Sequence, residues 1–329
     1  MRAAWYTSNG KAQDVLQLGE LPTPEPGPGE VRVRLAVSGV NPSDVKSRAG
    51  SRPVRPGELI VPHSDGAGTV DKVGPGVPAG REGERVWVWN GQWRRPLGTC
   101  AEFIVLPAAQ AVPLPGNVSF EAGACLGIPA LTAVHAVERL GDVQGRAVLV
   151  TGAASGVGYY AAQMARLRGA RVIGTVGSEE KAAALAGVGI ADAVYYKTEP
   201  VAERILALTD GEGVHGIVDM DFSTTAALLP QGVLAPHGRY VGYGSNERGG
   251  IPVDFGTCLT RSLGLQFFLV YDLQAEARER AVRDVNALLA ADSLSHLIAP
   301  AYGLDDVAAA HQAVEGGRLL GNVVVRLPG

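Results

Sequence analysis

The segment Val148–Gly158, with the sequence VLVTGAASGVG, constrains the fold more than any other part of the chain. An apolar run over Ala147–Thr151 predicts a buried strand, and the pattern over Val157–Leu167 predicts a helix. The residues between them are small. A buried strand that turns through small residues directly into a helix is typical of the first half of a βαβ unit.

The chain that follows repeats this alternation. We expect further strands at Arg171–Val176, Ala193–Tyr196, Gly216–Met220 and Gly238–Gly242. Helical patterns separate them at Lys181–Ala186 and Val201–Leu208. Alternating strands and helices predict a doubly wound parallel sheet of the Rossmann type, and therefore an α/β fold class.

The segments on either side of this region have a different sequence pattern. Before Ser119 we expect short strands separated by turn residues, which predict an irregular antiparallel or barrel-like domain; they span Glu30–Val40, Gly66–Val73, Arg85–Trp89 and Ala101–Leu106. The tail after Leu265 has helical patterns at Ala275–Ala291 and Asp305–Val314, then a strand pattern at Gly321–Leu327. We expect this tail to return to the first domain. The sequence thus predicts a Rossmann domain of residues 121–265 inserted into a mainly β domain of residues 1–120 plus 266–329.

Composition excludes several classes of protein. The net charge of −4 and the lack of a basic stripe argue against nucleic acid or an anionic membrane as a partner. No apolar run is long enough for a membrane span, and we expect no signal peptide. The three cysteines are widely scattered, which favours a reducing compartment, the cytoplasm.

The turn after the first Rossmann strand is a candidate phosphate-binding site. Ala153, Ser155 and Gly158 occupy the three glycine positions of the pattern G-x-G-x-x-G. Small residues let the backbone approach a pyrophosphate, and a helix N-terminus offers N–H groups to it. We expect dinucleotide contacts from Ala153, Ser155, Gly156, Val157 and Gly158; the alternative is a structural turn without a ligand.

The end of the second strand bears on which dinucleotide binds. An acidic residue there selects NAD, but this strand ends at Val176 and continues into Gly177 and Ser178. Ser178 and Lys181 can bind a 2′-phosphate by hydroxyl and ammonium, which favours NADPH over NADH. The alternative is that Ser178 is an N-cap and Lys181 a solvated residue of the first turn.

Several motifs together resemble one family. They are the dinucleotide segment above, Asn41-Pro42-Ser43-Asp44, Pro62-His63-Ser64-Asp65, Leu131-Thr132-Ala133 and Gly242-Tyr243-Gly244-Ser245. The chain resembles zinc-free medium-chain dehydrogenase/reductases, and most closely the NADPH:quinone oxidoreductases that include zeta-crystallin. The resemblance implies a GroES-like catalytic domain, a homodimer, and hydride transfer from NADPH to a quinone between the two domains.

The resemblance also implies site residues. On the cofactor side these are Thr132, Gly177, Ser178, Lys181, Tyr196, Gly242, Tyr243, Gly244, Ser245, Phe267, Phe268, Leu269 and Asn322. On the catalytic side these are Asn41, Asp44, Lys46 and Asp65. From the residues alone, Asn41, Asp44 and Asp65 are equally turn or cap residues.

The same comparison bears on metal. Zinc-dependent relatives have a cysteine at the position of Asn41 and a His-Glu pair at the position of Ser64-Asp65. His63 is the only histidine near this segment in the sequence, and the others are dispersed and read as structural or solvated. A catalytic zinc needs three protein ligands. We therefore expect no metal.

Other functions remain open. The first is reduction of the C=C bond of an enone, an alkenal or a haloacrylate with NADPH. A second is a non-enzymatic role, crystallin-like or RNA-binding, which the charge disfavours. Tyrosines of many relatives are replaced here by Lys46 and Arg52, with Arg48 and Arg55 nearby. These cations indicate either an anionic or carbonyl-rich substrate or a solvated basic loop.

Overall fold

The computed structural model describes residues 1–328, so Gly329, the last residue of the expected catalytic domain, lies outside it. The chain divides into two compact units. Unit 1 contains residues 1–128 together with the residues from Val285 onward, and unit 2 contains residues 129–284. Residues 121–128 and 266–284 thus lie on the other side of the boundary from the sequence-based division. Residues 266–267 belong to unit 2 because they pair with β12.

Unit 2 is built on a six-stranded sheet in which every pairing is parallel. The order is β10-β9-β8-β11-β12-β13, with β8 (Ala147–Val150), β9 (Arg171–Val176), β10 (Asp192–Tyr195), β11 (Val214–Asp219), β12 (Leu234–Gly242) and β13 (Gly264–Phe267). The order reverses between β8 and β11, which is the topological switch point where α/β sheets bind ligands. The predicted Rossmann sheet is confirmed, and β13 is a sixth strand that the sequence pattern did not reveal.

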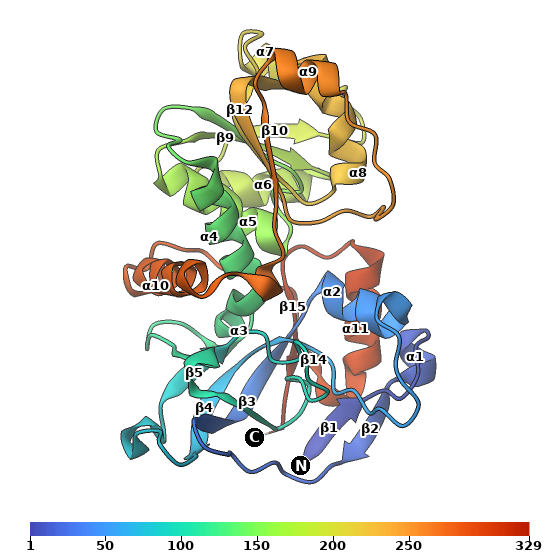
Figure 1. Cartoon of the computed structure of the whole chain (residues 1–329), viewed down its shortest axis with the longest axis vertical. Helices are drawn as coiled ribbons and strands as arrows, with labels where there is room; N and C mark the ends of the chain where they lie inside the picture. Colours follow the sequence, from blue (N-terminus) through green and yellow to red (C-terminus); the bar gives the residue numbers. More distant parts are fainter. Residues whose placement is uncertain (329) are drawn as a thin grey trace. The chain divides into compact units, whose positions relative to one another are not determined.

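Helices cover both faces of this sheet (Figure 1). They are α4 (Leu131–Leu140), α5 (Gly156–Leu167), α6 (Glu179–Ala186), α7 (Val201–Leu208), α8 (Phe222–Thr225) and α9 (Phe255–Thr260). Pro129 lies in a π-helical turn at residues 126–130, directly before α4. Proline interrupts regular helical hydrogen bonding there, because it has no backbone N–H to donate. The sheet core includes Leu149, Ile173 and Ile217, all fully buried.

Unit 1 contains a seven-stranded sheet whose pairings are antiparallel except for β14 with β15. Its strands are β3 (Glu30–Val40), β4 (Asp65–Val73), β5 (Arg85–Val88), β6 (Phe103–Pro107), β7 (Ala111–Pro113), β14 (Tyr302–Gly303) and β15 (Val323–Arg326). β15 pairs with β3, so the C-terminal strand does return to the first domain as expected. A separate pair, β1 (Arg2–Trp5) with β2 (Gln17–Glu20), was missed. Strands this short carry too few alternations to be recognised.

The remaining helices of unit 1 are short, except at the C-terminal side. They are α1 (Ala12–Val15), α2 (Pro42–Lys46), α3 (Phe120–Gly123) and α11 (Val307–Gly316), and α10 (Ala275–Ala290) runs across the boundary between the units. The expected helix from Asp305 begins with a 3-10 turn at residues 304–306. Within residues 1–328, no helix combines the length and apolarity needed to cross a bilayer.

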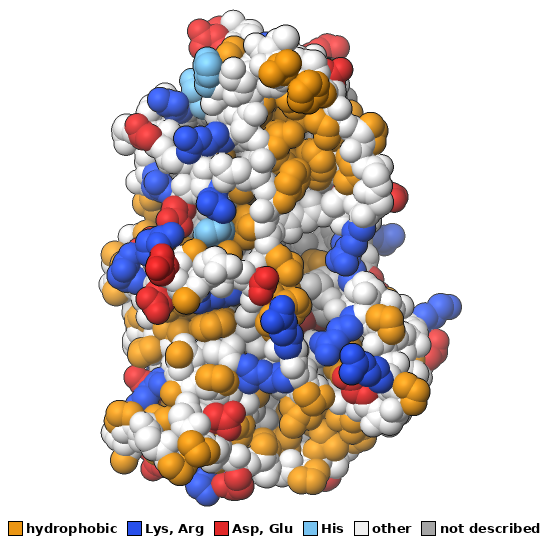
Figure 2. Space-filling view, in the orientation of Figure 1, with side chains coloured by type: hydrophobic (Ala, Val, Ile, Leu, Met, Phe, Trp, Pro, Cys, Tyr) orange, Lys and Arg blue, Asp and Glu red, His pale blue; other side chains and the backbone are white. Residues whose placement is uncertain are grey.

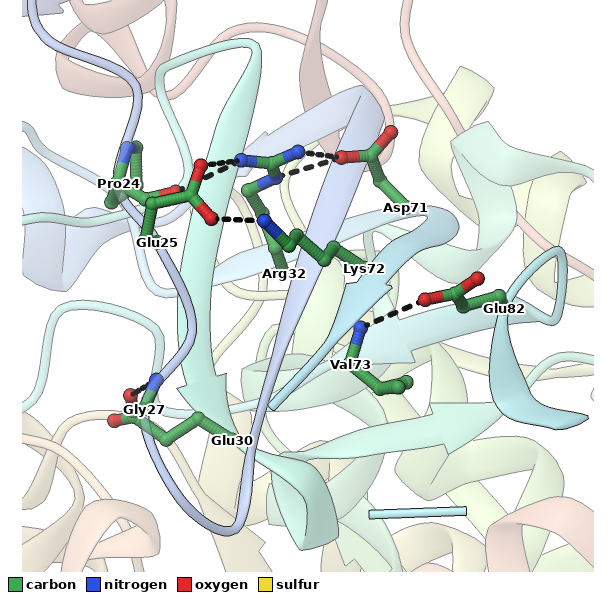
Figure 3. Close-up of polar contacts among 9 residues, drawn as sticks. All are labelled: Pro24, Glu25, Gly27, Glu30, Arg32, Asp71, Lys72, Val73 and Glu82. Carbon is green, nitrogen blue, oxygen red and sulfur yellow. Dashed lines mark hydrogen bonds and ion pairs between the residues drawn. The ribbon is translucent and has the colours of Figure 1, made fainter. Parts of the chain in front are cut away.

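Ion pairs attach the proline-rich segment before β3 to the sheet (Figure 3). The Arg32 guanidinium lies 2.8 Å from Glu25 and donates from Nε to Asp71 at 2.7 Å. Lys72 contacts the second Glu25 oxygen at 2.5 Å. Glu30 accepts a hydrogen bond from the Gly27 N–H at 2.9 Å. A loop rich in Pro and Gly is thereby held along β3 and β4 by side chains, together with backbone hydrogen bonds such as that from the Gly29 N–H to the Pro75 carbonyl at 2.8 Å.

Leu149 offers a test of the unit 2 core. Leu149→Ala should lower the free energy of unfolding by about 2–5 kcal/mol, because the central strand cannot collapse around the cavity. The same substitution at Leu167, whose relative exposure is 43%, should change it by less than about 1 kcal/mol. Urea denaturation followed by circular dichroism measures both. Equal losses at the two positions would contradict this account of the core.

Candidate functional site

The turn between β8 and α5 is shaped by two glycines. Gly152 has a φ of +57°, in the left-handed region, and its N–H donates to Thr175 Oγ1 at 2.8 Å. A Cβ on Gly158 would lie 2.2 Å from the Gly152 carbonyl oxygen. Any side chain at position 158 would therefore push the start of α5 away from the strand. The absence of a Cβ there lets the start of α5 pack directly against the turn.

Ala153 replaces the first glycine of the dinucleotide pattern without filling the turn. Its side chain is fully buried and points at β9, where a Cβ on Gly174 would lie 2.7 Å from the Ala153 Cβ. The Ala153 N–H donates to the Thr175 carbonyl at 3.0 Å. The room that the usual glycine provides is supplied here by Gly174 on the neighbouring strand.

Ser155 is the N-cap of α5. Its Oγ accepts a hydrogen bond from the Gly158 N–H at 3.3 Å. The N–H groups of Gly156 and Val157 occupy the first two helical positions, which have no intrahelical carbonyl to bond. With the partial positive charge of the helix end, these donors suit a diphosphate. The predicted residues 153–158 are thus together at one open helix terminus.

A pocket of about 450 Å³ lies at the end of β9, and it is lined by Gly177, Ser178, Glu179, Tyr195, Lys197, Thr198 and Glu199. Ser178 caps α6 by accepting the Lys181 N–H at 3.4 Å, so the N-cap role weighed from the sequence is present. The Tyr196 hydroxyl lies over Gly177, where a Cβ would approach it to 2.9 Å. The pocket lies where a Rossmann fold binds the adenosine ribose.

Lys197 was not selected from the sequence. It lines this pocket, and its Nζ lies 5.9 Å from the centroid of the Tyr196 ring. Two carboxylates also line the pocket. One of them, Glu199, accepts the Tyr195 N–H at 2.5 Å and lies 3.6 Å from Arg204, so its charge is partly compensated. The position of Lys197 directly after the third strand, next to Tyr196, was the signal that could have identified it.

The loops after β11 and β12 approach each other closely. A Cβ on Gly244 would lie 2.5 Å from the Met220 carbonyl oxygen, and the Tyr243 N–H donates to the Asp219 carbonyl at 3.0 Å. The Phe268 N–H donates to the Gly242 carbonyl at 3.3 Å, which places the segment Phe267–Leu269 beside this loop. Ser245 Oγ accepts the Ser223 N–H at 3.2 Å. Residues 242–245 and 267–269 therefore form one edge of unit 2.

Two buried hydroxyls of unit 2 are unpaired within residues 1–328: Thr132 on α4 and Tyr243 after β12. Burial raises the pKa of Tyr243, so its hydroxyl stays protonated. A buried hydroxyl without a partner is costly unless a ligand supplies one. These orphaned groups, the open turn and the pocket at β9 fit a nicotinamide dinucleotide.

Asp219 anchors the loops around the end of β11 through a buried hydrogen-bond network. It is fully buried at the end of β11 and accepts hydrogen bonds from Thr151 at 2.6 Å, from Thr225 at 2.7 Å and from the Tyr240 hydroxyl. Burial raises the pKa of this carboxyl, and the hydroxyl donors oppose that shift. The network joins the ends of β8 and β11 to α8, so the loops around the switch point have a fixed base.

In unit 1, three of the four predicted catalytic residues form a buried cluster. Asn41 precedes α2, and its N–H donates to Asp44 Oδ2 at 2.8 Å as half of a capping box. The Asn41 side-chain amide donates to Asp65 Oδ2 at 2.8 Å. The same oxygen accepts the Ile128 N–H at 3.0 Å. Asn41 and Asp44 are therefore cap residues of α2 and also members of the buried cluster.

Burial sets the protonation of both carboxyls. It raises the pKa of Asp44 to about 7, against the opposing hydrogen bonds from Asn41. It raises the pKa of Asp65 well above the ordinary value, and the Asp44 charge adds to this. Asp65 Oδ1 is buried and unpaired within residues 1–328. Burial thus favours the protonated form of both carboxyls.

Lys46 and Asn322 lie outside this cluster. Lys46 is exposed at the end of α2. Asn322 lies at the start of β15 in unit 1, and its side-chain amide donates to the Leu297 carbonyl at 3.3 Å. Their roles remain predictions from the resemblance.

The histidines are not all dispersed, as the sequence had suggested. His311 on α11 contacts His63, with their Nε2 atoms 2.9 Å apart, and His63 Nδ1 lies 2.9 Å from Ser38 Oγ. Burial lowers the pKa of both imidazoles, so they are neutral. Arg48 also departs from the expectation of a solvated loop, because it is 1% exposed and bonds Gly10 and Glu315. Within residues 1–328, no three His, Cys, Asp or Glu side chains are grouped to hold a metal.

Known proteins match this arrangement over the whole chain. Residues 27–116 match the alcohol dehydrogenase GroES-like domain, and residues 156–287 match the zinc-binding dehydrogenase family. A quinone oxidoreductase of Pseudomonas aeruginosa is 33% identical over 320 residues, 95% of each chain. The chain belongs to the medium-chain dehydrogenase/reductase family, in its quinone oxidoreductase group.

Other members of the family show its range. A 2-haloacrylate reductase of a Burkholderia species is 30% identical and covers 93% of each chain. A solved NAD-dependent alcohol dehydrogenase has a TM-score of 0.89 at 30% identity over the full length of both chains. A mycobacterial protein solved with NADPH has a TM-score of 0.85 at 29% identity and covers 99% of this chain and 100% of that one. The family assignment thus establishes an oxidoreductase with an NAD(P)-binding fold.

The carboxyl cluster predicts how stability depends on pH. The folded-state pKa of each carboxyl is raised above its unfolded value, so folding binds protons and stability falls as pH rises from about 4 through about 7. The limit is about 1.4 kcal/mol per pH unit for each group. Asp65→Asn imitates the protonated carboxyl and should flatten this decline. Urea unfolding at pH 5 and pH 7.5 measures it.

Asp306→Asn is the matched control, because Asp306 is exposed. It should keep the decline of the parent protein. A decline as steep in Asp65→Asn as in the parent would refute the assignment of a proton to this buried carboxyl.

Proposed function

We propose that this protein is an NADPH-dependent, zinc-independent oxidoreductase that transfers hydride to a quinone. The observation that carries the proposal is the small-residue turn at Gly152–Gly158 against the N-terminus of α5, together with the orphaned hydroxyls of Thr132 and Tyr243, which a bound cofactor would satisfy. The relative named a quinone oxidoreductase at 33% identity supports the substrate class.

The residues of unit 2 divide the work of holding NADPH. Gly156 and Val157 offer N–H groups to the diphosphate at the N-terminus of α5. Ser178, Lys181, Tyr196 and Lys197 recognise the 2′-phosphate. Thr132 and residues 242–245 hold the nicotinamide, where Thr132 Oγ1 would gain a partner. Bound NADPH supplies the hydride, and the protein supplies position and electrostatics.

The residues of unit 1 orient the electrophile. Asn41 is held between two carboxyls, so its amide has one orientation and little freedom to lose when a substrate binds. We assign Asn41 the contact to a substrate carbonyl. Asp44 and Asp65 act as positioning residues that hold Asn41 and store a proton. The buried environment excludes water from these groups, which strengthens each hydrogen bond.

Zinc independence is supported by what occupies the metal-ligand positions. Asn41 and Asp65 hydrogen-bond each other, and His63 is engaged with Ser38 and His311. A catalytic zinc needs three ligands that converge on one point. Here the candidate ligands form hydrogen bonds with neighbouring side chains instead. An electron-poor quinone can accept hydride with hydrogen bonds alone on its oxygen.

Reduction of an activated C=C bond is the second candidate function. The 2-haloacrylate reductase at 30% identity supports it, and the chemistry differs only in which atom of the substrate accepts the hydride.

We also propose a cytoplasmic homodimer that binds neither nucleic acid nor membrane. The homodimer is supported by the edge strand β13 and by Phe255 and Leu259 on α9, the helix that precedes β13 in the chain, which are 73% and 64% exposed. The scattered cysteines favour the cytoplasm, and the net charge of −4 argues against nucleic acid and anionic membrane.

Coenzyme selection can be tested at the pocket beside β9. Lys197→Ala should weaken NADPH binding by roughly 10- to 100-fold, the loss typical of a charged hydrogen bond. NADH binding should change less than about twofold, since NADH lacks the 2′-phosphate. Fluorescence titration of both coenzymes measures the two constants.

Lys11→Ala is a suitable control, because Lys11 is an exposed lysine of unit 1 that does not line the pocket. It should leave the NADPH to NADH preference within about twofold of the parent. Parallel weakening of both coenzymes in Lys197→Ala would argue against a 2′-phosphate contact.

Turnover tests the reaction and the absence of metal together. Protein dialysed against a strong chelator should oxidise NADPH with 1,4-benzoquinone at the parent rate. Asn41→Ala should lower kcat/KM by about 10- to 100-fold through loss of one positioned donor. Loss of activity on chelation, with recovery on adding Zn²⁺, would reject the metal-free mechanism. Faster turnover of an enone than of any quinone would favour the second candidate.

A further inference from the structure

A second pocket, of about 580 Å³, lies entirely in unit 1. It is lined by Arg52, Pro53, Arg55, Glu58, Arg94, Arg95 and Pro96. Four of these seven side chains are guanidinium groups and one is a carboxylate. Figure 2 shows Lys and Arg side chains gathered over the region of α2 and the π-helical turn that follows it. The pocket was not apparent from the sequence, because its two arginine pairs are about forty residues apart.

Backbone hydrogen bonds hold the two sides of the pocket together. The Val61 N–H donates to the Pro96 carbonyl, and the Gly98 N–H donates to the Val61 carbonyl, both at 2.9 Å. Asn9 holds the other side. Its amide donates to the Arg52 carbonyl at 3.0 Å and its Oδ1 accepts the Val54 N–H at 3.0 Å. The arginines thus project from anchored backbone rather than from a free loop.

Arg95 gives the strongest indication that the pocket suits an anion. It is half-buried, and its guanidinium donates to the Gln110 side chain and to the Val105 carbonyl at 3.4 Å. Within residues 1–328 its hydrogen-bond partners are neutral. Burial lowers the pKa of Arg95, and the Glu30 charge opposes that shift. A half-buried guanidinium with neutral partners is costly, and a bound anion would lower that cost.

Glu58 does not balance the arginines that surround it. Its Oε2 accepts the Arg55 N–H at 3.1 Å, and its Oε1 lies 3.9 Å from Arg52. It therefore helps to shape the Arg52–Glu58 turn and weakly compensates one guanidinium. The lining side chains retain an excess of positive charge in a chain whose net charge is −4. That contrast points to a local function rather than to general surface charge.

We propose that this pocket binds an anionic group, phosphate or carboxylate, carried by the substrate. Guanidinium groups present paired N–H donors that match these anions. The volume exceeds that of one phosphate, so it suits a substrate with several anionic groups, such as a phosphorylated or acidic thioester with an activated C=C bond, or an acidic quinone. Asn41 lies in the same unit as the pocket, and in the sequence it precedes the pocket residue Arg52 by eleven positions. The proposal rests on the proposed function for the reaction, but anion binding can be measured without it.

The first experiment measures binding alone. Inorganic pyrophosphate is titrated calorimetrically into protein saturated with NADP⁺, which occupies the dinucleotide site. The double variant Arg52→Gln/Arg55→Gln should weaken this binding at least about tenfold. Arg283→Gln, at an exposed arginine outside the pocket, should leave it unchanged. Undiminished binding in the double variant would overturn the proposal.

The second experiment compares matched electrophiles with NADPH. The pairs are 1,4-naphthoquinone against its 2-sulfonate, and crotonaldehyde against crotonyl-coenzyme A. The double variant should lose about 10- to 100-fold in kcat/KM, mainly through KM, for the anionic member only. Arg52→Lys/Arg55→Lys should recover part of that loss, because charge returns without the paired donors. Equal effects on neutral and anionic members would overturn the proposal.

The two experiments separate the two proposals. Pyrophosphate binding that depends on Arg52 and Arg55, with no turnover of any electrophile, would refute the proposed reaction and retain the anion site. Such binding with turnover that ignores substrate charge would indicate a free anion as ligand, and would overturn the claim that the anion belongs to the substrate.

Discussion

The close approach of Gly158 to the Gly152 carbonyl is the contact on which the cofactor half of the protein depends. It brings the N-terminus of α5 against the end of β8, at the point where the strand order reverses. Any Cβ at position 158 would separate them. The tip of β9 and the loops after β11 and β12 lie at the same sheet edge because the strands are parallel, and this contact brings the donors at the helix end to that edge.

The turn keeps this geometry although the glycine of the dinucleotide pattern is replaced by Ala153, because a glycine stands on the neighbouring strand instead. Ala153 stands where the dinucleotide pattern has glycine, yet its methyl group faces Gly174 on β9 rather than the ligand side. What the fold requires is therefore space at one place between β8 and β9. Either strand can supply that space, which explains why an imperfect motif still forms an open turn.

Unit 1 uses buried charge differently at its two sites. Asp44 and Asp65 are removed from water, and burial raises the pKa of both; Asp44 accepts the Asn41 backbone N–H and Asp65 accepts its side-chain amide, so Asn41 is fixed between them. The arginine pocket keeps its guanidinium groups partly solvated and anchors the backbone beneath them. The first arrangement suits a rigid hydrogen-bond donor, and the second suits an anion that arrives and leaves.

The sequence alone determined the parallel sheet of unit 2, the return of the last strand to the first domain, and the small-residue turn between β8 and α5. Those features depend on local periodicity and on small residues that are adjacent in the chain, so they are visible in order. Tertiary structure alone decided that His311 meets His63, that Arg48 is buried, and that Arg94 and Arg95 join Arg52 and Arg55. Each of these brings together residues that are distant in sequence or turns one side chain inward. No local pattern specifies such contacts, because they depend on how complete strands and loops pack.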